Sequence, residues 1–327
     1  MTKPLIIAIV AGLAAALLYL SVATGSVLSV LLFYLAPLPL FVAGLGWGLP
    51  VGIVAMLVAT GAALILGPLP SFTFLLTIGA PTLWLIRLAL LARPDENGDP
   101  VWYPAERLVL WTAALATGLV LVALPMIGFG SAEFRADVEA LVAQMFAVPE
   151  LTDPPVGDGA AGEAGAQIAD TVVRLLPVMA SLTWMMITLF NLWLAARIAK
   201  ASKVLMRPWP RLRDIDFPPS AALAFGAAVV ASFAPGWIGT IGQVASGTLA
   251  FAFLLLGLAV LHSLVANHAM RRAILIGIYF ILIVTPFSVV ALFMIVGLGV
   301  AEALTNVRAR RGPPAPPSTP PAPPGAV

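Results

Sequence analysis

The stretch 27-VLSVLLFYLAPLPLFVAGLGWGLPVGIVAMLVATGAALIL-66 decides the fold, because it contains no charged residue over its whole length. About 20 apolar residues are enough for a helix to cross the roughly 30 Å hydrocarbon core of a bilayer. The stretch is therefore long enough for two crossings, with the expected turn at Gly46, Trp47 and Gly48. Other charge-free runs lie on both sides of it: Leu5–Val22, Ser71–Ile86, Leu108–Ser131, Leu175–Ala196 and Ser220–His262. The sequence thus predicts an all-α, polytopic bundle of transmembrane helices.

Composition also indicates a membrane protein. Charged residues make up 10% of the 327 residues, whereas soluble domains carry about 25%. The net charge of +2 is too small to indicate nucleic acid as a partner, so the expected partner is the lipid bilayer. Cysteine is absent, which excludes disulfides, thiolate metal sites and cysteine nucleophiles. Because Leu5–Val22 is longer than the core of a signal peptide, we expect an uncleaved first helix.

Residues 1–311 form the expected transmembrane domain, which two polar segments interrupt. Segment 132–167 is expected to be an extracytoplasmic loop. Within it, Ala132–Phe146 has the spacing of a short interfacial helix, and Pro149–Ala166 has the composition of a flexible linker. Segment 200–219 is the most basic one and is expected to be a cytoplasmic loop. Residues 312–327 are almost all Pro, Ala, Ser, Thr and Gly, which predicts a disordered, proline-rich tail.

Lys and Arg predict the orientation, because they favour the cytoplasmic side of a membrane protein. In a bacterial inner membrane, the 132–167 loop would then lie outside, and the basic segments inside: Lys3, 93–107, 197–213, Arg271–Arg272 and 308–311. The last apolar stretch, Ala273–Thr305, is broken at Thr285 and Pro286, and it must cross twice to keep 308–311 inside. It is expected to be a pair of short helices or a re-entrant hairpin. We therefore expect eight to ten membrane segments, favour ten, and place both termini in the cytoplasm.

Small residues recur every four positions in the first helix, at Ala8, Gly12 and Ala16. Such spacing lets two helices approach closely in lipid, where packing replaces the hydrophobic force between helices. The ladder predicts either packing inside the bundle or docking to a separate membrane subunit. Both alternatives stay open at this point.

One helix carries a polar face at membrane depth, formed by Trp184, Thr188 and Asn191, which are spaced i, i+4 and i+7. An amide in hydrocarbon needs hydrogen-bond partners, so Asn191 is expected either to bond a neighbouring backbone or to line a ligand cavity. Nearer the outer end of the same helix, Asp170 and Arg174 are expected to form a local i, i+4 ion pair.

No motif indicates catalysis or a cofactor. The chain has no phosphate-binding glycine loop, no His-Glu-x-x-His helix and no Gly-x-Ser-x-Gly elbow. Its acids lie in loops or near helix ends, Asp170 and Glu302 among them, which disfavours acid–base chemistry or proton pumping at membrane depth. His262 and His268 do not share a helical face well, which disfavours a metal site. We expect neither an enzyme nor a bound metal or cofactor.

The basic loop Arg207-Pro-Trp-Pro-Arg-Leu-Arg-Asp-Ile-Asp-Phe-Pro218, and a final pair of short segments with Gly297, Gly299 and a basic end, resemble the YybS-like family of predicted bacterial inner-membrane proteins. That family is remotely similar to the substrate-binding subunits of energy-coupling-factor vitamin transporters. The resemblance implies docking to a membrane coupling subunit through small residues, for which Ala8, Gly12 and Ala16 are the candidate positions. It implies no substrate.

Two functions follow as expectations. The first is a small-molecule uptake component that binds its ligand from outside, with Trp184, Thr188 and Asn191 as the candidate ligand residues, and that needs a partner to supply energy. The second is a structural or assembly protein of the cell envelope, which would contact an envelope protein through its loops and tail.

Overall fold

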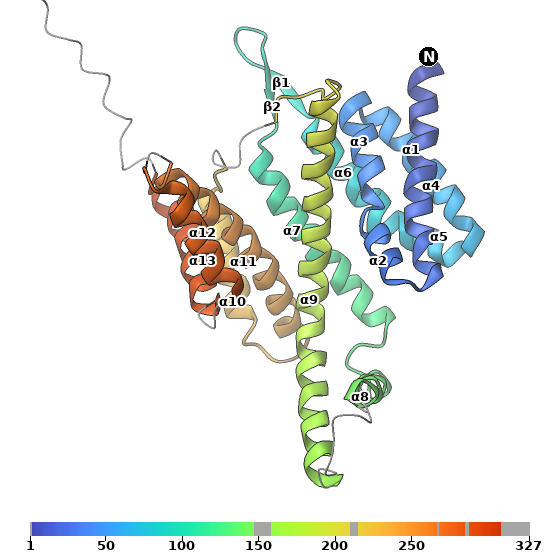
Figure 1. Ribbon diagram of the computed structural model, residues 1–327, viewed down its shortest axis with the longest axis vertical. Coiled ribbons are helices and arrows are strands. Elements are labelled where there is room, and N and C mark those ends of the chain that lie inside the picture. The colour runs from blue at the N-terminus through green and yellow to red at the C-terminus, as the bar shows by residue number, and fades with distance from the viewer. Residues whose placement is uncertain (1, 147–157, 210–214, 267, 285–287, 309–327) are drawn as a thin grey trace, which may run out of the picture. The chain divides into compact units, whose positions relative to one another are not determined.

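The structure is a computed structural model that describes residues 2–146, 158–209, 215–266, 268–284 and 288–308 (Figure 1). Its elements are almost all helical. The first half of the chain forms α1 (Thr2–Leu20), α2 (Val27–Tyr34), α3 (Pro37–Trp47), α4 (Leu49–Ala63), α5 (Pro68–Phe74), α6 (Ala80–Ala89), the strands β1 (Ala92–Pro94) and β2 (Pro100–Trp102), α7 (Ala105–Met126) and α8 (Ala132–Phe146). The second half forms α9 (Asp158–Ala201), α10 (Pro219–Ala231), α11 (Gly236–Leu264), α12 (Arg271–Val284) and α13 (Ser288–Thr305).

Within the described residues, eight helical segments are long and apolar enough to cross a membrane, and α10 is a shorter apolar helix. This confirms the predicted all-α, polytopic bundle. The expected pair of short helices near the C-terminus is present as α12 and α13. Residues Thr285 and Pro286, where the break was predicted, lie outside the described residues, as does the tail 312–327. Whether α12, with 14 residues, crosses the membrane stays a prediction.

Three elements differ from the sequence-based expectation. The polar loop 93–106 contains a short antiparallel hairpin, in which Arg93 pairs with Val101. Helix α9 begins at Asp158, inside the segment expected to be a flexible linker, because its alanines favour a helix. Helix α11 begins at Gly236, although the closely spaced glycines at 236, 239 and 242 favour a turn over a helix. Side chains at Gly239 and Gly242 would collide with the backbone of Ala234 and Ser232, so these glycines permit close packing.

The chain divides into two compact units, and the division falls within α10 and within α11. The first unit comprises residues 1–211 and 223–252. Its membrane core includes an apolar cluster centred on α1 and α4 and another on α3, α6 and α9. In the first cluster, Tyr19 packs edge-on against Phe74 at 5.1 Å, and its hydroxyl donates to the carbonyl of Pro70 at 2.9 Å.

Helix α9 is the longest element of the first unit. It has 44 residues, which corresponds to about 66 Å at 1.5 Å per residue, roughly twice the hydrocarbon thickness. Figure 1 shows its green N-terminal part, beside α8, extending past α1 to α7 of the same unit. There Val138 and Val142 of α8 pack against Ala169 and Val173 of α9. Helix α8 occupies the residues predicted for the interfacial helix.

The second unit comprises residues 212–222 and 253–327. It contains α12, α13 and the C-terminal part of α11. Two glycines let α11 and α13 touch backbone to backbone. A Cβ at Gly257 would overlap the carbonyl oxygen of Ile295, and a Cβ at Gly299 would overlap that of Phe253.

Replacing Gly299 by alanine is therefore expected to destabilise the protein by about 1–3 kcal/mol, the usual range for overpacking a well-packed contact. Gly297, two residues away on the same helix, is the matched control, because a Cβ there meets nothing within 4 Å. Thermal unfolding in detergent, followed by circular dichroism, measures the difference. Equal melting temperatures for Gly299→Ala and Gly297→Ala would contradict the contact.

Candidate functional site

The polar face of α9 makes its first contact through Trp184. The indole Nε1 donates a hydrogen bond of 2.9 Å to the carbonyl of Thr77, which lies in the π-helical turn Leu75–Gly79 between α5 and α6. In an α-helix this carbonyl would accept from residue 81, but Pro81 has no N–H. Trp184 thus supplies the donor that the proline lacks. Short π-helical turns are frequent at functional sites.

Asn191 makes the second contact, two turns further along α9. Its Nδ2 donates to the carbonyls of Tyr34 and Ile187, both at 2.8 Å. Tyr34 is the last residue of α2. Helix α3 begins at Pro37, which has no backbone N–H that could donate a hydrogen bond. The amide of Asn191 therefore bonds the backbone at the break between α2 and α3. Its Oδ1 is buried and has no hydrogen-bond partner in the described part of the chain.

A pocket of about 280 Å³ lies between these two contacts, inside the first unit. Apolar and aromatic groups form most of its wall, together with several hydroxyl groups. No charged side chain is among its lining residues, which are Phe33, Tyr34, Pro37, Thr77, Ile78, Thr82, Ala180, Thr183, Trp184, Ile187 and Thr188. Within the described residues, the hydroxyls of the buried Thr82 and Thr188 form no hydrogen bond. The pocket can therefore offer hydrogen bonds to a small molecule without first breaking its own.

The structure brings two of the three predicted ligand residues to this pocket. Trp184 and Thr188 line it, whereas Asn191 bonds the backbone and is not part of the lining. The backbone bond was the alternative left open for Asn191 from the sequence. The contributions of α2, α3 and α6 were missed, although Pro37 and Pro81 inside apolar runs were signals of the break between α2 and α3 and of the π-helical turn before α6.

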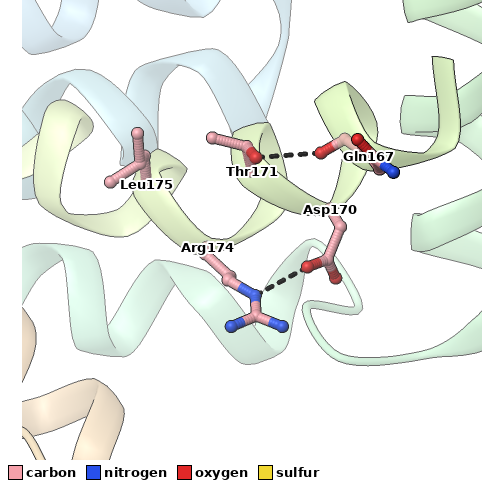
Figure 2. Close-up of a pocket in the computed structure, with 5 residues that line it drawn as sticks. All are labelled: Gln167, Asp170, Thr171, Arg174 and Leu175. Carbon is pink, nitrogen blue, oxygen red and sulfur yellow. Dashed lines mark hydrogen bonds and ion pairs between the residues drawn. The ribbon is translucent and has the colours of Figure 1, made fainter. Parts of the chain in front are cut away.

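A second, more open depression of about 720 Å³ lies on the protruding part of α9 (Figure 2). Its two charged groups and its hydroxyl are already engaged. Asp170 pairs with Arg174 at 2.7 Å and with Arg135 of α8 at 3.2 Å, and the hydroxyl of Thr171 donates to the carbonyl of Gln167. These side chains hold α8 on α9. The less open pocket next to Trp184 is the better candidate for a ligand site, because the hydroxyls of Thr82 and Thr188 form no hydrogen bond within the described residues and most of its wall is apolar.

The small-residue ladder lies inside the first unit. Ala8, Gly12 and Ala16 are buried, and a Cβ at Gly12 would overlap the carbonyl oxygen of Ala55 on α4. The ladder thus mediates the close contact of α1 with α4, which is the packing alternative considered for it. Docking of a partner through these three residues would require α1 to move away from α4.

No group of three or more His, Cys, Asp or Glu that could hold a metal ion occurs among the described residues. His262 contacts the carbonyl of Leu258 at 2.8 Å through Nδ1, and Nδ1 of His268 accepts a bond from the amide of Met270. Each imidazole thus has a local backbone partner.

A comparison with known proteins identifies the family. The family model described as "Predicted membrane protein (DUF2232)" matches residues 12–299, which is most of the chain. The chain belongs to this family of predicted membrane proteins. No curated protein and no protein of solved structure matches it. The narrower YybS-like resemblance and the remote likeness to energy-coupling-factor transporters stay predictions.

Proposed function

We propose that this protein is the ligand-binding component of a small-molecule uptake system. The observation that carries the proposal is the pocket beside α9, which lies among helices long and apolar enough to cross a membrane. It presents the hydroxyls of Thr82 and Thr188, which form no hydrogen bond within the described residues. Ligand pockets are typically concave and mostly apolar, with a few polar groups that fix orientation. This pocket has that composition, and its volume of about 280 Å³ suits a small molecule.

The lining predicts an uncharged ligand. A charged molecule would lose its hydration in an apolar wall that offers no opposite charge, which is costly. The rings of Phe33 and Trp184 and the side chain of Ile187 would contact an apolar or aromatic body. Thr82 and Thr188 can each donate and accept hydrogen bonds. We therefore propose a small, neutral, ring-containing molecule with at least one hydrogen-bonding group.

The energy for uptake is proposed to come from a partner, because the sequence has no phosphate-binding loop of its own. A membrane coupling subunit is the partner that the resemblance to energy-coupling-factor transporters implies. We do not assign the docking surface to Ala8, Gly12 and Ala16, since these residues already pack against α4. No enzymatic step is part of the proposal.

We propose the bacterial inner membrane as the location, with the N-terminus, the β1–β2 hairpin and the end of α9 on the cytoplasmic side. These parts lie at one end of the first unit (Figure 1). Basic residues gather in the same segments: Lys3, Arg87, Arg93, Arg107, Arg197, Lys200 and Lys203. Lys and Arg favour cytoplasmic loops. Attachment of a reporter to each terminus tests this topology.

A role in envelope assembly is the second candidate, and one observation favours it. The protruding parts of α8 and α9 expose apolar side chains, among them Leu141, Ile168 and Val172. Such side chains could contact another envelope protein outside the membrane. An assembly role does not require the pocket, so the ligand experiment below separates the two candidates.

The double variant Thr82→Val, Thr188→Val is expected to retain about 100-fold less ligand, since each lost hydrogen bond costs about 1–1.5 kcal/mol, or about tenfold. Valine keeps the shape of threonine and removes only the hydroxyl. Thr112→Val is the matched control: its hydroxyl is buried but bonds the carbonyl of Leu108 on α7, outside the pocket.

The measurement is untargeted mass spectrometry of small molecules that stay bound to the full-length protein after incubation with a cell extract. A compound that the native protein and Thr112→Val retain, and that the double variant loses, supports uptake of a neutral ligand. Equal retention by all three proteins, or no retained compound at all, would favour the assembly role.

A further inference from the structure

An aromatic and arginine cluster joins α6 and α7 where both helices end at the same membrane boundary. Arg87 lies in the last turn of α6, and Arg107 in the first turn of α7. Both helices belong to segments that can cross a membrane, Pro68–Ala89 and Ala105–Met126. The two arginines therefore lie at the level where apolar chain meets polar surroundings.

Three aromatic side chains connect the two arginines without a gap. The guanidinium of Arg87 lies 5.6 Å from the ring centre of Trp84, whose ring packs edge-on against Trp111 at 5.2 Å. Trp111 donates from Nε1 to the hydroxyl of Tyr103 at 3.1 Å. Arg107 lies over the ring of Tyr103, with its Cζ 5.8 Å from the ring centre. Stacking on the rings holds both guanidiniums in place.

The two guanidiniums are exposed, and within the described residues neither forms an ion pair. The acid nearest to Arg107 along the chain is Glu106, whose charge acts on the buried Arg207. Further acids lie in the hairpin between β1 and β2, which projects beyond the helix ends (Figure 1). There Asp95 accepts bonds from its own turn, from the amides of Asn97 and Asp99.

A third donor in the cluster also lacks an acceptor. The indole Nε1 of Trp84, in the ring on which Arg87 stacks, is buried and has no hydrogen-bond partner in the described part of the chain. Within the described residues, the cluster thus combines two arginines without an ion pair and an N–H donor without an acceptor with aromatic rings at a membrane boundary.

We propose that this cluster binds the phosphate headgroup of an anionic phospholipid. Guanidinium groups match phosphate oxygens with paired hydrogen bonds. Trp and Tyr favour the headgroup level of a bilayer, and basic pockets between transmembrane helices bind anionic headgroups. The lipid chains would lie along the exposed apolar surfaces of α6 and α7. This site is separate from the pocket beside α9 and does not depend on the proposed uptake function.

The test uses the full-length protein in detergent, mixed with equal amounts of phosphatidylglycerol and phosphatidylcholine. Lipids that stay bound after detergent washing are quantified by mass spectrometry. We expect the native protein to enrich phosphatidylglycerol. Each basic residue near an anionic surface contributes about a fivefold gain in affinity. The double variant Arg87→Gln, Arg107→Gln should therefore bind phosphatidylglycerol about 25-fold more weakly than the native protein. The lysine pair Arg87→Lys with Arg107→Lys keeps the charge but not the paired bonds and should lie in between.

Arg197→Gln is the matched control. Arg197 is exposed and also stacks on a tryptophan, with its Cζ 5.7 Å from the ring centre of Trp193, but it is not connected to the cluster. Its loss should leave the enrichment unchanged. The proposal fails if phosphatidylcholine binds equally well, or if Arg197→Gln has the same effect as the glutamine pair. Displacement of the lipid by millimolar inorganic phosphate would show that the site takes free phosphate instead, and would also overturn the lipid assignment.

Discussion

Replacing Arg207 by alanine is expected to lower the free energy of unfolding by about 3–5 kcal/mol, because hydrogen bonds from a charged donor contribute about 1.5–3 kcal/mol each. The residue is only 5% exposed, although it belongs to the most basic segment of the chain. Its Nη1 donates to the carbonyl of Ala89 at 2.9 Å and to that of Tyr103 at 3.1 Å. The side chain thus ties the segment after α9 to the ends of α6 and of the hairpin.

The position of Arg207 follows from the electrostatics of helix ends. Ala89 is the last residue of α6, and the last carbonyls of a helix lack helical donors and carry the negative end of its dipole. The rings of Trp102 and Trp209 lie 5.9 and 5.7 Å from the guanidinium carbon. Burial lowers the pKa of Arg207, and the charge of Glu106 acts in the opposite direction. Because arginine stays protonated in proteins, its charge needs these acceptors.

Two further variants make the expectation specific. Arg207→Lys keeps the charge but offers a single ammonium in place of the planar guanidinium, and it should recover only part of the stability. Arg93→Ala, an exposed position on β1, removes the same charge from the same end of the first unit and should change stability by less than about 0.5 kcal/mol. Chemical unfolding in detergent, followed by circular dichroism, provides the comparison. If Arg207→Ala is no more harmful than Arg93→Ala, the buried role is wrong.

The membrane-spanning helices could be predicted because the backbone of a charge-free run inside a bilayer finds no water to bond. Such a run forms a helix, in which the backbone N–H and C=O groups bond each other. The helical spacing of Ala132–Phe146 predicted α8 for a similar reason, since one apolar face must be covered. The polar face of α9 was also visible, as Trp184 and Thr188 lie at the spacing of one helical turn.

What the sequence did not indicate depends on contacts between distant segments. Pro37 and Pro81 lie inside apolar runs that read as continuous helices, and their effect depends on side chains about 100 residues or more away, Asn191 and Trp184. The burial of Arg207 also depends on distant segments, because the carbonyls that accept its hydrogen bonds lie 104 and 118 positions earlier in the chain. Local periodicity contains no information on such pairs. The sequence therefore predicted only the pocket residues on α9, and not those on α2, α3 and α6.

Glu302→Gln is expected to destabilise the protein by about 3 kcal/mol, at the lower end of the range for breaking a buried ion pair. Glu302 is 2% exposed near the end of α13, and its Oε1 lies 2.6 Å from Nε of Arg308. Its Oε2 accepts from the backbone amide of Arg308 at 3.1 Å. The arginine also donates from Nη2 to the carbonyl of Ile215 at 2.6 Å and lies 3.8 Å from Asp216. The pair thus fastens the segment before α10 to α13, inside the second unit.

Glu302→Gln is expected to lower stability because it removes the negative charge next to Arg308 and leaves the positive charge of Arg308 in place. Arg308 is only 20% exposed at its side chain, and the glutamine removes the carboxylate that lies 2.6 Å from it, whereas Asp216 is half exposed and lies 3.8 Å away. Removing both charges, with Glu302→Gln and Arg308→Gln together, should cost less than the sum of the single changes, because neither charge is then left without the other. Arg271→Gln, an exposed change at the start of α12, is the control for losing a charge in the second unit.

A double-mutant cycle in detergent measures this coupling directly. We expect an interaction energy of about 1–3 kcal/mol between Glu302 and Arg308, and a change below about 0.5 kcal/mol for Arg271→Gln. Strictly additive single changes would show that the two side chains act independently. In that case Arg308 would hold the 215–216 segment through its bond to Ile215 without help from Glu302, alongside apolar contacts such as Phe217 against Phe253 at 5.5 Å.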